Sequence, residues 1–222
     1  MNKHHLKKLI EIGDIKQGYV GTNSKKWGES VLGKTVKLDS YLDKKFERKE
    51  LFEYCKNKKN NDYNVIVAIL SWGGMRRDHG RLFFKNYISV SELIDNLRIG
   101  KFITRKEAFK EFQNWRRTNP NLGIGIGYYT KLICFLSPVL NGYIMDQWAS
   151  KSINLLWGEE IVKLQNNVWV NDSNNEFVYE TYCQKIDELA VIMGCSGFEA
   201  EKRIFSLGYG KGEWRNYLKK HY

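Results

Sequence analysis

The sequence predicts an all-α protein, and three observations support that class. Its 222 residues include only two prolines, so few positions forbid a helix. Apolar residues recur at intervals of three and four through most of the chain, which is the spacing of one helix face. Aromatic residues make up 14% and are interleaved with polar residues that helices tolerate. At this length the chain can bury a substantial core, and we expect a single domain over residues 1–222, or two small helical lobes.

The first 72 residues predict three helices with a long glycine-rich connection. Leu6, Leu9 and Ile10 indicate one short helix, and the glycines between residues 13 and 33 favour loops. Residues 38–57 show a helical pattern that Asp39 or Ser40 could cap. The apolar run 63–72 fits a buried helix or a strand, and its helical surroundings favour a helix.

The remaining elements follow the same logic. Ser89 and Glu92 form a capping-box pattern at the start of a helix over 89–97. Residues 163–175 are polar around Val168-Trp169-Val170, which indicates a loop or a short strand pair. The other expected helices cover residues 104–117, 176–193 ended by Gly194, 196–207 ended by Gly208, and a last short one around Trp214–Leu218.

The charge balance favours a polyanionic partner. Lys and Arg number 36 against 25 Asp and Glu, which gives a formal net charge of +11 and a pI near 9.4. Nucleic acid is the commonest polyanion, and the alternative is a basic surface without a partner. The four cysteines are scattered without a C-x2-C pair, so neither a metal nor another cofactor is expected. No apolar run of 18 residues and no signal-peptide pattern is present, so we expect a cytoplasmic protein without membrane contact.

The segment 121–157 holds the most informative pattern. Gly123, Gly125 and Gly127 allow a tight turn that brings peptide N–H groups close to an anion, at the start of a helix. Lys131 is the one charged residue in the apolar run 129–136, which Pro138, Asn141 and Gly142 should end. Asp146 then falls where it can cap the next helix.

This segment resembles a known family. G-I-G-Y-Y-T-K (Gly125 to Lys131), followed by I-M-D (Ile144 to Asp146), resembles the hairpin and catalytic aspartate of helix-hairpin-helix DNA glycosylases. The Thr130-Lys131 pair is most similar to the 8-oxoguanine DNA glycosylase-like branch. The resemblance implies two helical lobes with the active site in the cleft between them. It also implies that the hairpin amides hold a DNA phosphate.

The same resemblance assigns the catalytic residues. Asp146 follows Gly127 by 19 residues, close to the family's interval, and would help to break the glycosidic bond. In bifunctional members a lysine attacks the sugar and forms a Schiff base. Counted on the family pattern, Tyr129 occupies the lysine position and Lys131 comes two positions late. Either Lys131 is the nucleophile of a shifted hairpin, or the enzyme is monofunctional with Tyr129 in that place.

Flanking residues complete the expected site. An apolar helix that ends in Trp72-Gly73-Gly74, with arginines following, suits an extruded nucleotide, because aromatic rings stack on bases and arginines hold phosphates. The alternative is a helix end with a buried Trp72 and solvated arginines. We therefore expect Trp72, Met75 and Tyr129 to line a base pocket. Phosphate contacts are expected from the three hairpin glycines and from Arg76, Arg116 and Arg117.

Three functions compete on this basis. The favoured one is a monomeric glycosylase that acts on double-stranded DNA in bacterial anti-phage defence and removes a hypermodified cytosine, such as glucosylated hydroxymethylcytosine. The sequence around the hairpin departs far from that of housekeeping repair enzymes, which favours this function over an 8-oxoguanine repair glycosylase with AP-lyase activity. The third is a non-catalytic helix-hairpin-helix DNA-binding module, which would not need Asp146.

Overall fold

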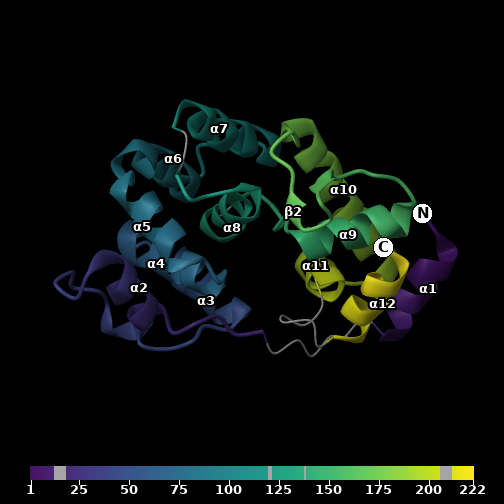
Figure 1. Ribbon diagram of the computed structural model, residues 1–222, viewed down its shortest axis with the longest axis horizontal. Coiled ribbons are helices and arrows are strands. Elements are labelled where there is room, and N and C mark those ends of the chain that lie inside the picture. The colour runs from purple at the N-terminus through teal and green to yellow at the C-terminus, as the bar shows by residue number, and fades with distance from the viewer. Residues whose placement is uncertain (13–18, 120–121, 138, 206–211) are drawn as a thin grey trace. The chain divides into compact units, whose positions relative to one another are not determined.

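The structure is a computed structural model that describes residues 1–12, 19–119, 122–137, 139–205 and 212–222 (Figure 1). These residues form twelve α-helices and one two-stranded sheet, which confirms the all-α class. The chain divides into two compact units. We name Val20–Leu140 the hairpin unit, and Met1–Tyr19 together with Asn141–Tyr222 the aspartate unit.

The hairpin unit is built around one buried helix, α8 (Ile126–Leu136), which packs on α3, α4, α6 and α7 (Figure 1). Every side chain from Tyr129 to Leu136 is buried, as expected for a helix enclosed on all sides. The surrounding elements are α2 (Ser24–Leu32), the 3-10 helix η1 (Ser40–Leu42), α3 (Arg48–Lys56), α4 (Asp62–Trp72), α5 (Arg77–Lys85), α6 (Ile88–Ile99) and α7 (Arg105–Thr118).

Helix α2 was not expected, because its sequence was assigned to glycine-rich loops. Asn23 caps it by accepting a hydrogen bond from the Lys26 amide at 2.9 Å. A Cβ at Gly28 would lie 2.6 Å from Leu38 Cδ1 and 2.9 Å from Val67 Cγ1. This glycine therefore allows α2 to pack closely on α4, and the prediction of a loop over 24–32 is wrong. The glycines at 13 and 18 lie outside the described residues.

The single helix expected over 38–57 is also wrong. Asp39 caps only the short η1, and α3 begins at Arg48. Between them the chain is extended, because Phe46 is fully buried and its carbonyl accepts a hydrogen bond from the Gly21 amide at 3.3 Å. Glu47 pairs with Val20 in a β-bridge. This tertiary pairing overrides the local helical pattern.

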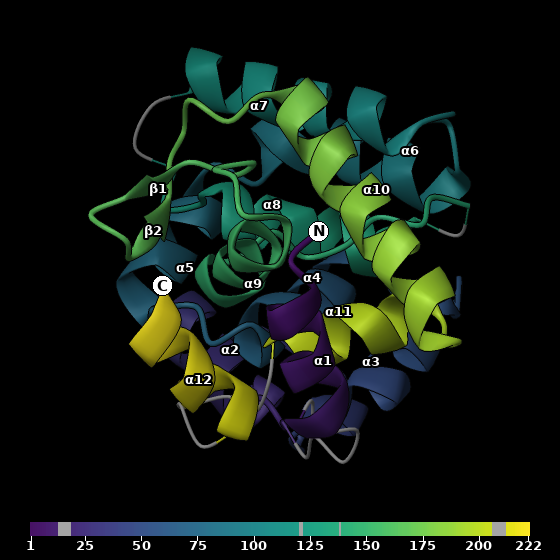
Figure 2. The ribbon, with the colours of Figure 1, turned by 90° about the vertical axis from the view of Figure 1, so that its right-hand side faces the viewer.

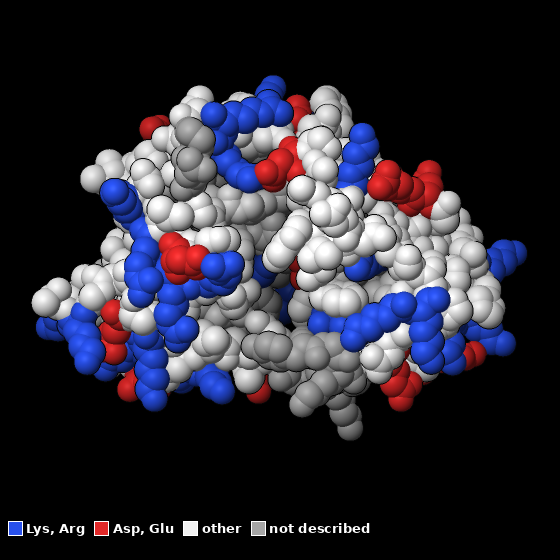
Figure 3. All heavy atoms as spheres, viewed as in Figure 1, with Lys and Arg blue, Asp and Glu red and all other residues white. Residues whose placement is uncertain are grey.

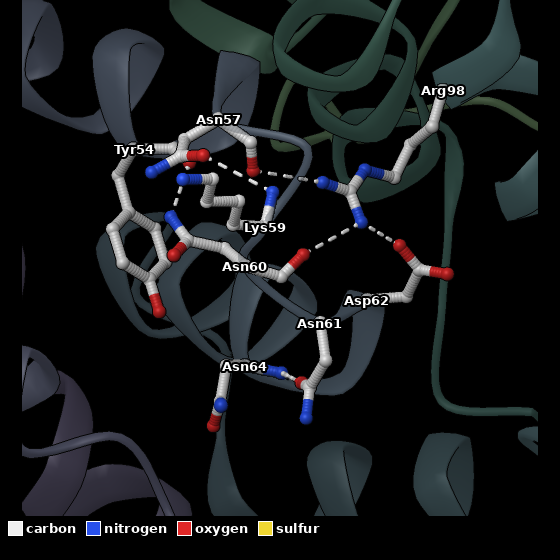
Figure 4. Close-up of polar contacts among 8 residues, drawn as sticks. All are labelled: Tyr54, Asn57, Lys59, Asn60, Asn61, Asp62, Asn64 and Arg98. Carbon is white, nitrogen blue, oxygen red and sulfur yellow. Dashed lines mark hydrogen bonds and ion pairs between the residues drawn. The ribbon is translucent and has the colours of Figure 1, made fainter.

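The polar connection between α3 and α4 is held by an arginine of α6 (Figure 4). Arg98 donates to the carbonyls of Asn57 at 3.3 Å and Asn60 at 3.0 Å, and forms an ion pair with Asp62. Asn61 caps α4 by accepting from the Asn64 amide at 2.8 Å. These contacts fix the start of α4, whose other end forms the Trp72 turn.

The capping box expected at Ser89 is absent, because α6 begins at Ile88 with Tyr87 in the cap position. The Ser89 hydroxyl instead donates to the Asn86 carbonyl at 2.7 Å and accepts from the Trp115 indole at 3.1 Å. Thr104 does cap α7, accepting from the Glu107 amide at 3.1 Å. The helix expected over 104–117 is therefore confirmed.

The aspartate unit is built around α9 (Gln147–Trp157), which packs on α1, α10, α11 and α12 (Figure 2). The buried Ser152 hydroxyl lies 2.9 Å from the Trp214 indole nitrogen and 2.7 Å from the Ile204 carbonyl, which joins three helices. The elements are α1 (Lys3–Ile12), β1 (Leu164–Gln165), β2 (Trp169–Val170), α10 (Glu176–Met193), α11 (Gly197–Phe205) and α12 (Glu213–His221).

Most expectations for this unit are confirmed. The antiparallel strands β1 and β2 form the short strand pair, with Asn166 and Asn167 at positive φ in the turn. Gly194 ends α10 at φ +62°. The end expected at Gly208 lies outside the described residues. Of the helices that the structure describes, none has the length and apolar character needed to cross a bilayer.

Candidate functional site

The hairpin joins α7 to α8, with residues 120 and 121 outside the described part. Within it, Leu122, Ile124 and Ile126 are buried, while the three glycines between and after them are partly exposed. The apolar side chains therefore anchor the loop, and the glycine backbone faces outward at alternate positions.

Gly123 is a glycine for structural reasons. Its φ is +69°, in the left-handed region that other residues rarely adopt. A Cβ on it would lie 2.5 Å from the His79 carbonyl oxygen of α5. Gly123 therefore allows the hairpin to pack against the backbone of α5.

Neither its backbone angles nor its neighbours require a glycine at Gly125. Its φ is −110°, which any residue can adopt, and a Cβ on it would meet no heavy atom within 4 Å. It stands at the N-cap of α8, and its carbonyl accepts from the Tyr128 and Tyr129 amides at 2.9 and 3.1 Å. The amides of Ile126 and Gly127 open the helix and have no partner within it. The open space in front of them suits an anion, which the helix dipole also favours.

The net charge of the protein lies entirely in the hairpin unit. This unit contains 23 Lys and Arg against 12 Asp and Glu, whereas the aspartate unit contains 13 of each. Figure 3 shows a group of these basic side chains over α2 and α5. The hairpin unit is therefore the part of the molecule that attracts a polyanion.

The three predicted arginines lie at helix ends, one at the start of α5 and two at the end of α7. Arg76 is exposed at the N-cap of α5 and forms a two-point ion pair with Asp78 at 3.1 and 2.6 Å. Burial raises the pKa of Tyr128 in the first turn of α8, and the charge of nearby Arg76 partly offsets that rise. Arg116 and Arg117 lie in the last turn of α7, with Arg117 exposed.

Lys131 is buried, and its amine lies at the start of α8. The Nζ atom donates to the Gly127 carbonyl at 2.7 Å and stands 5.0 Å from the centre of the Tyr128 ring. Helical side chains lean toward the N-terminus, so the amine sits one turn before its own Cα. This explains how a lysine two positions late along the sequence can still present its amine beside the hairpin.

The expected pocket residues are all buried. Trp72 is 5% exposed and packs edge to face on Phe135, which agrees with the alternative of a buried Trp72 at the helix end. Met75 is also buried, and its carbonyl accepts from the Trp27 indole at 2.7 Å. Gly73 between them touches Lys131, since a Cβ there would lie 2.8 Å from Lys131 Cδ. The structure thus brings the Trp72–Met75 turn against the lysine.

Tyr129 belongs to the core of the hairpin unit. It is 1% exposed, with its ring centre 5.1 Å from Phe109 and 5.8 Å from Phe112 of α7. In this conformation its side chain joins α8 to α7 and does not reach a surface where a base could bind.

Asp146 caps α9 in the aspartate unit. Its Oδ1 accepts from the Trp148 amide at 2.9 Å and from the Ala149 amide at 3.0 Å, and the residue is partly exposed. Oδ2 accepts no hydrogen bond from the residues that the structure describes. One carboxylate oxygen is therefore fixed by the helix, and the other is available for chemistry.

The segment before Asp146 is held by residues that the sequence did not identify as functional. The Ile144 carbonyl accepts from the Tyr182 hydroxyl at 2.7 Å, and the Ile144 amide donates to the Glu201 carboxylate at 3.2 Å. The Tyr179 hydroxyl donates to the Tyr143 carbonyl at 3.0 Å. The sequence could have indicated these residues through the tyrosines on the buried face of α10, because a buried hydroxyl needs a hydrogen-bond partner.

No three His, Cys, Asp or Glu side chains of the described residues come close enough together to hold a metal ion. Asp146 and Lys131 lie in different units.

The family assignment rests on one comparison. A family model described as "Putative 8-oxoguanine DNA glycosylase OGG-like protein" matches residues 13–205. This range includes the hairpin, Lys131, Asp146 and the residues that hold Ile144, and it ends before α12. Searches of curated proteins and of solved structures give no match. Since the matched range covers most of the chain, the protein belongs to the OGG-like family of DNA glycosylases.

Proposed function

We propose that the protein extrudes a modified base from double-stranded DNA and cleaves its N-glycosidic bond, with Asp146 as the catalytic carboxylate. The observation that carries this proposal is the geometry of Asp146. Two amides of α9 hold Oδ1, while Oδ2 has no hydrogen bond within the described residues. A carboxylate fixed in this way suits a role beside a reacting sugar.

The chemistry follows from the bond that breaks. When the C1′–N bond cleaves, its electron pair leaves with the base and positive charge develops at C1′. A fixed carboxylate stabilises that charge, and it can take the proton of the water that adds to C1′. The products are the free base and an abasic site.

In this proposal the hairpin unit supplies DNA binding. The amides at the start of α8 would hold a backbone phosphate in front of Gly125, where the structure leaves open space. Arg76, Arg116 and Arg117 would contact neighbouring phosphates. The Trp72–Met75 turn, which lies against Lys131, is the proposed wall of the base pocket; Tyr129 is not included, because it packs against α7.

The proposed substrate is a hypermodified cytosine such as glucosylated hydroxymethylcytosine, in anti-phage defence. This choice rests on the sequence outside the hairpin and aspartate motifs, which departs from that of repair enzymes. The description of the family favours 8-oxoguanine as the second candidate substrate.

Lys131 offers an additional lyase step. To attack C1′ its amine must be neutral and must leave the Gly127 carbonyl, which it contacts at 2.7 Å. Burial within α8 favours the neutral form of a lysine. The lyase step is therefore a separate proposal, and the glycosylase proposal does not depend on it.

A substrate panel with a trapping arm tests both proposals. Wild type, Lys131→Gln and Asp146→Asn would be incubated with duplexes that carry 8-oxoguanine or uracil, and with phage DNA that contains glucosylated hydroxymethylcytosine. Base release by wild type and not by Asp146→Asn is the expected result, and the substrate that reacts names the base. If no base is released from any substrate and the protein binds DNA tightly and in a salt-sensitive way, it is a non-catalytic DNA-binding module and not a glycosylase.

Borohydride in the same reactions tests the lyase step. A covalent adduct that forms with wild type and disappears in Lys131→Gln would establish Lys131 as the nucleophile. Base release without any adduct would make the enzyme monofunctional.

A further inference from the structure

A cluster of three cations surrounds one tryptophan of the aspartate unit. The Trp148 ring centre lies 4.4 Å from the Arg215 guanidinium carbon, 4.9 Å from Lys151 Nζ and 5.9 Å from Lys219 Nζ. Two of these residues come from α12 and the third from α9, and Figure 3 shows basic side chains gathered over α12. We name Trp148, Lys151, Arg215 and Lys219 the Trp148 cluster.

Arg215 is built into the unit but has an unused donor. It is 3% exposed, lies between Trp148 and Phe205, and donates from Nη2 to the Phe205 carbonyl at 2.7 Å. Its Nε atom is buried and has no acceptor among the described residues. This buried guanidinium therefore places a fixed positive charge beside Trp148, in the first turn of α9.

The cluster also carries more positive charge than its surroundings balance. Lys151, Arg215 and Lys219 form no ion pair with any residue that the structure describes, although the unit as a whole is neutral. Burial lowers the pKa of Arg215, and the negative charge of the Asp146 carboxylate partly opposes that change. Burial also lowers the pKa of Lys151. Three cations beside one carboxylate favour the binding of an anion.

The position of the cluster identifies that anion. Trp148 follows Asp146 by two residues, so the cluster lies beside the carboxylate that would act on the sugar. Guanidinium and ammonium groups together are typical partners of phosphate oxygens.

We propose that the Trp148 cluster binds a backbone phosphate of the DNA strand whose nucleotide reacts at Asp146. This inference rests on the proposed glycosylase function and adds a phosphate contact on the aspartate unit, separate from the hairpin. The two lysines supply the donors, and Arg215 supplies a fixed positive charge behind them. Arg215 and Lys219 belong to α12, which lies beyond the range that the family model matches.

Two neighbouring lysines of α12 provide the test. Lys219 and Lys220 are both exposed and carry the same charge, but only Lys219 lies at the Trp148 ring. The affinity of the full chain for a fluorescent duplex would be measured from low to moderate salt. Lys219→Ala should weaken binding and lower the slope of log K against log salt by up to about 0.9, the value of one phosphate contact. Lys220→Ala should match wild type, and Lys219→Arg should restore the slope.

A second variant covers the partly exposed lysine of α9. Lys151→Met keeps an unbranched side chain against Trp148 and removes the charge, so it should weaken DNA binding with the same loss of slope and an unchanged unfolding midpoint. Equal effects of Lys219→Ala and Lys220→Ala, or a wild-type slope in both Lys219→Ala and Lys151→Met, would overturn the proposal.

Base release measured on the same proteins separates this proposal from the glycosylase proposal. Base release by wild type, with identical salt slopes in all variants, would remove the phosphate site and leave the glycosylase intact. The predicted difference in slopes, with no base release from any substrate, would support the phosphate site and remove the catalytic role. A wild type that binds no DNA would remove both.

Discussion

Asp146 has two roles that depend on different atoms of one side chain. Oδ1 caps α9 through the Trp148 and Ala149 amides, which is a structural role that asparagine performs equally well. The proposed catalytic role needs the negative charge, which asparagine lacks. Substitutions can therefore separate the two roles.

We expect Asp146→Asn to slow single-turnover base release by about 10²–10⁴-fold, the usual contribution of a positioned acid or base. Its unfolding midpoint and DNA affinity should stay close to wild type because the cap is kept. Asp146→Ala should also lose about 1 kcal/mol of stability with the cap. Equal loss of DNA binding and base release in Asp146→Asn would contradict the catalytic assignment.

Two glycines of the hairpin, Gly123 and Gly125, differ in the structural need for glycine at their positions. Gly123 has a positive φ and a Cβ on it would meet the His79 backbone, whereas Gly125 has ordinary backbone angles and open space. Apart from its N-cap position, a ligand that approaches the backbone would give Gly125 a reason to be glycine.

Gly125→Ala should change the unfolding free energy by less than about 1 kcal/mol, since alanine is only a poorer N-cap residue. The added methyl group would occupy the space in front of the hairpin and keep a phosphate away from the amides. DNA binding should therefore weaken about tenfold or more, because hydrogen bonds to a charged group are worth about 1.5–3 kcal/mol. Gly123→Ala is the contrasting variant, with an expected loss of order 1–3 kcal/mol in stability from the strained φ. Chemical denaturation and fluorescence anisotropy measure the two effects, and normal DNA affinity of a folded Gly125→Ala would contradict the phosphate site.

At the level of elements, α10 and α11 determine where α9 begins. They hold both polar backbone groups of Ile144, through the Tyr182 hydroxyl and the Glu201 carboxylate. Asp146 follows two residues later, so its position depends on helices that come at least 30 residues further along the chain. The position of the Asp146 carboxylate thus depends on the packing of its unit as well as on its own helix.

Glu201→Ala should leave the Ile144 amide without its acceptor, at a cost of about 1–3 kcal/mol in unfolding free energy. Base release should slow while DNA affinity changes little, because the hairpin lies in the other unit. Glu201→Gln keeps an oxygen acceptor and should recover most of the stability and rate. Stability measurements and single-turnover rates on the pair test this; a Gln variant as impaired as the Ala variant would show that the carboxylate charge matters instead.

For the whole molecule, the net positive charge and the proposed catalytic carboxylate lie in different units. The hairpin unit carries the entire net charge of +11, and Asp146 lies in the neutral unit. Binding to undamaged DNA should therefore depend mainly on the hairpin unit, and it should weaken steeply with salt.

Two double variants with the same total charge test this separation. Arg116→Gln with Arg117→Gln should lower the salt slope of DNA binding by up to about 0.9 for each arginine. Lys3→Gln with Lys7→Gln, exposed on α1 of the neutral unit, should leave the slope near that of wild type. Equal slopes in the two double variants would mean that only net charge matters.

Elements that depend on interactions between residues close in the sequence could be predicted, and elements that depend on contacts between distant residues could not. The helices at 63–72, 104–117 and 176–193 were predictable because their apolar spacing and caps are local. The same holds for Asp146, whose cap bonds reach only three residues along the chain. The helix through Gly28 and the break before Arg48 were missed, because contacts with Leu38, Val67 and Val20 decide them.

The same distinction between local and distant interactions applies to the candidate site. The sequence alone determined the helical class, the hairpin with its glycines and the aspartate that opens the next helix, since each depends on backbone geometry over a few residues. Only the tertiary structure decided that Trp72 and Tyr129 are buried, that the Lys131 amine returns to Gly127, and that Arg215 packs on Trp148. Side-chain burial and pairing between distant helices depend on how the whole chain packs, and no local pattern encodes them.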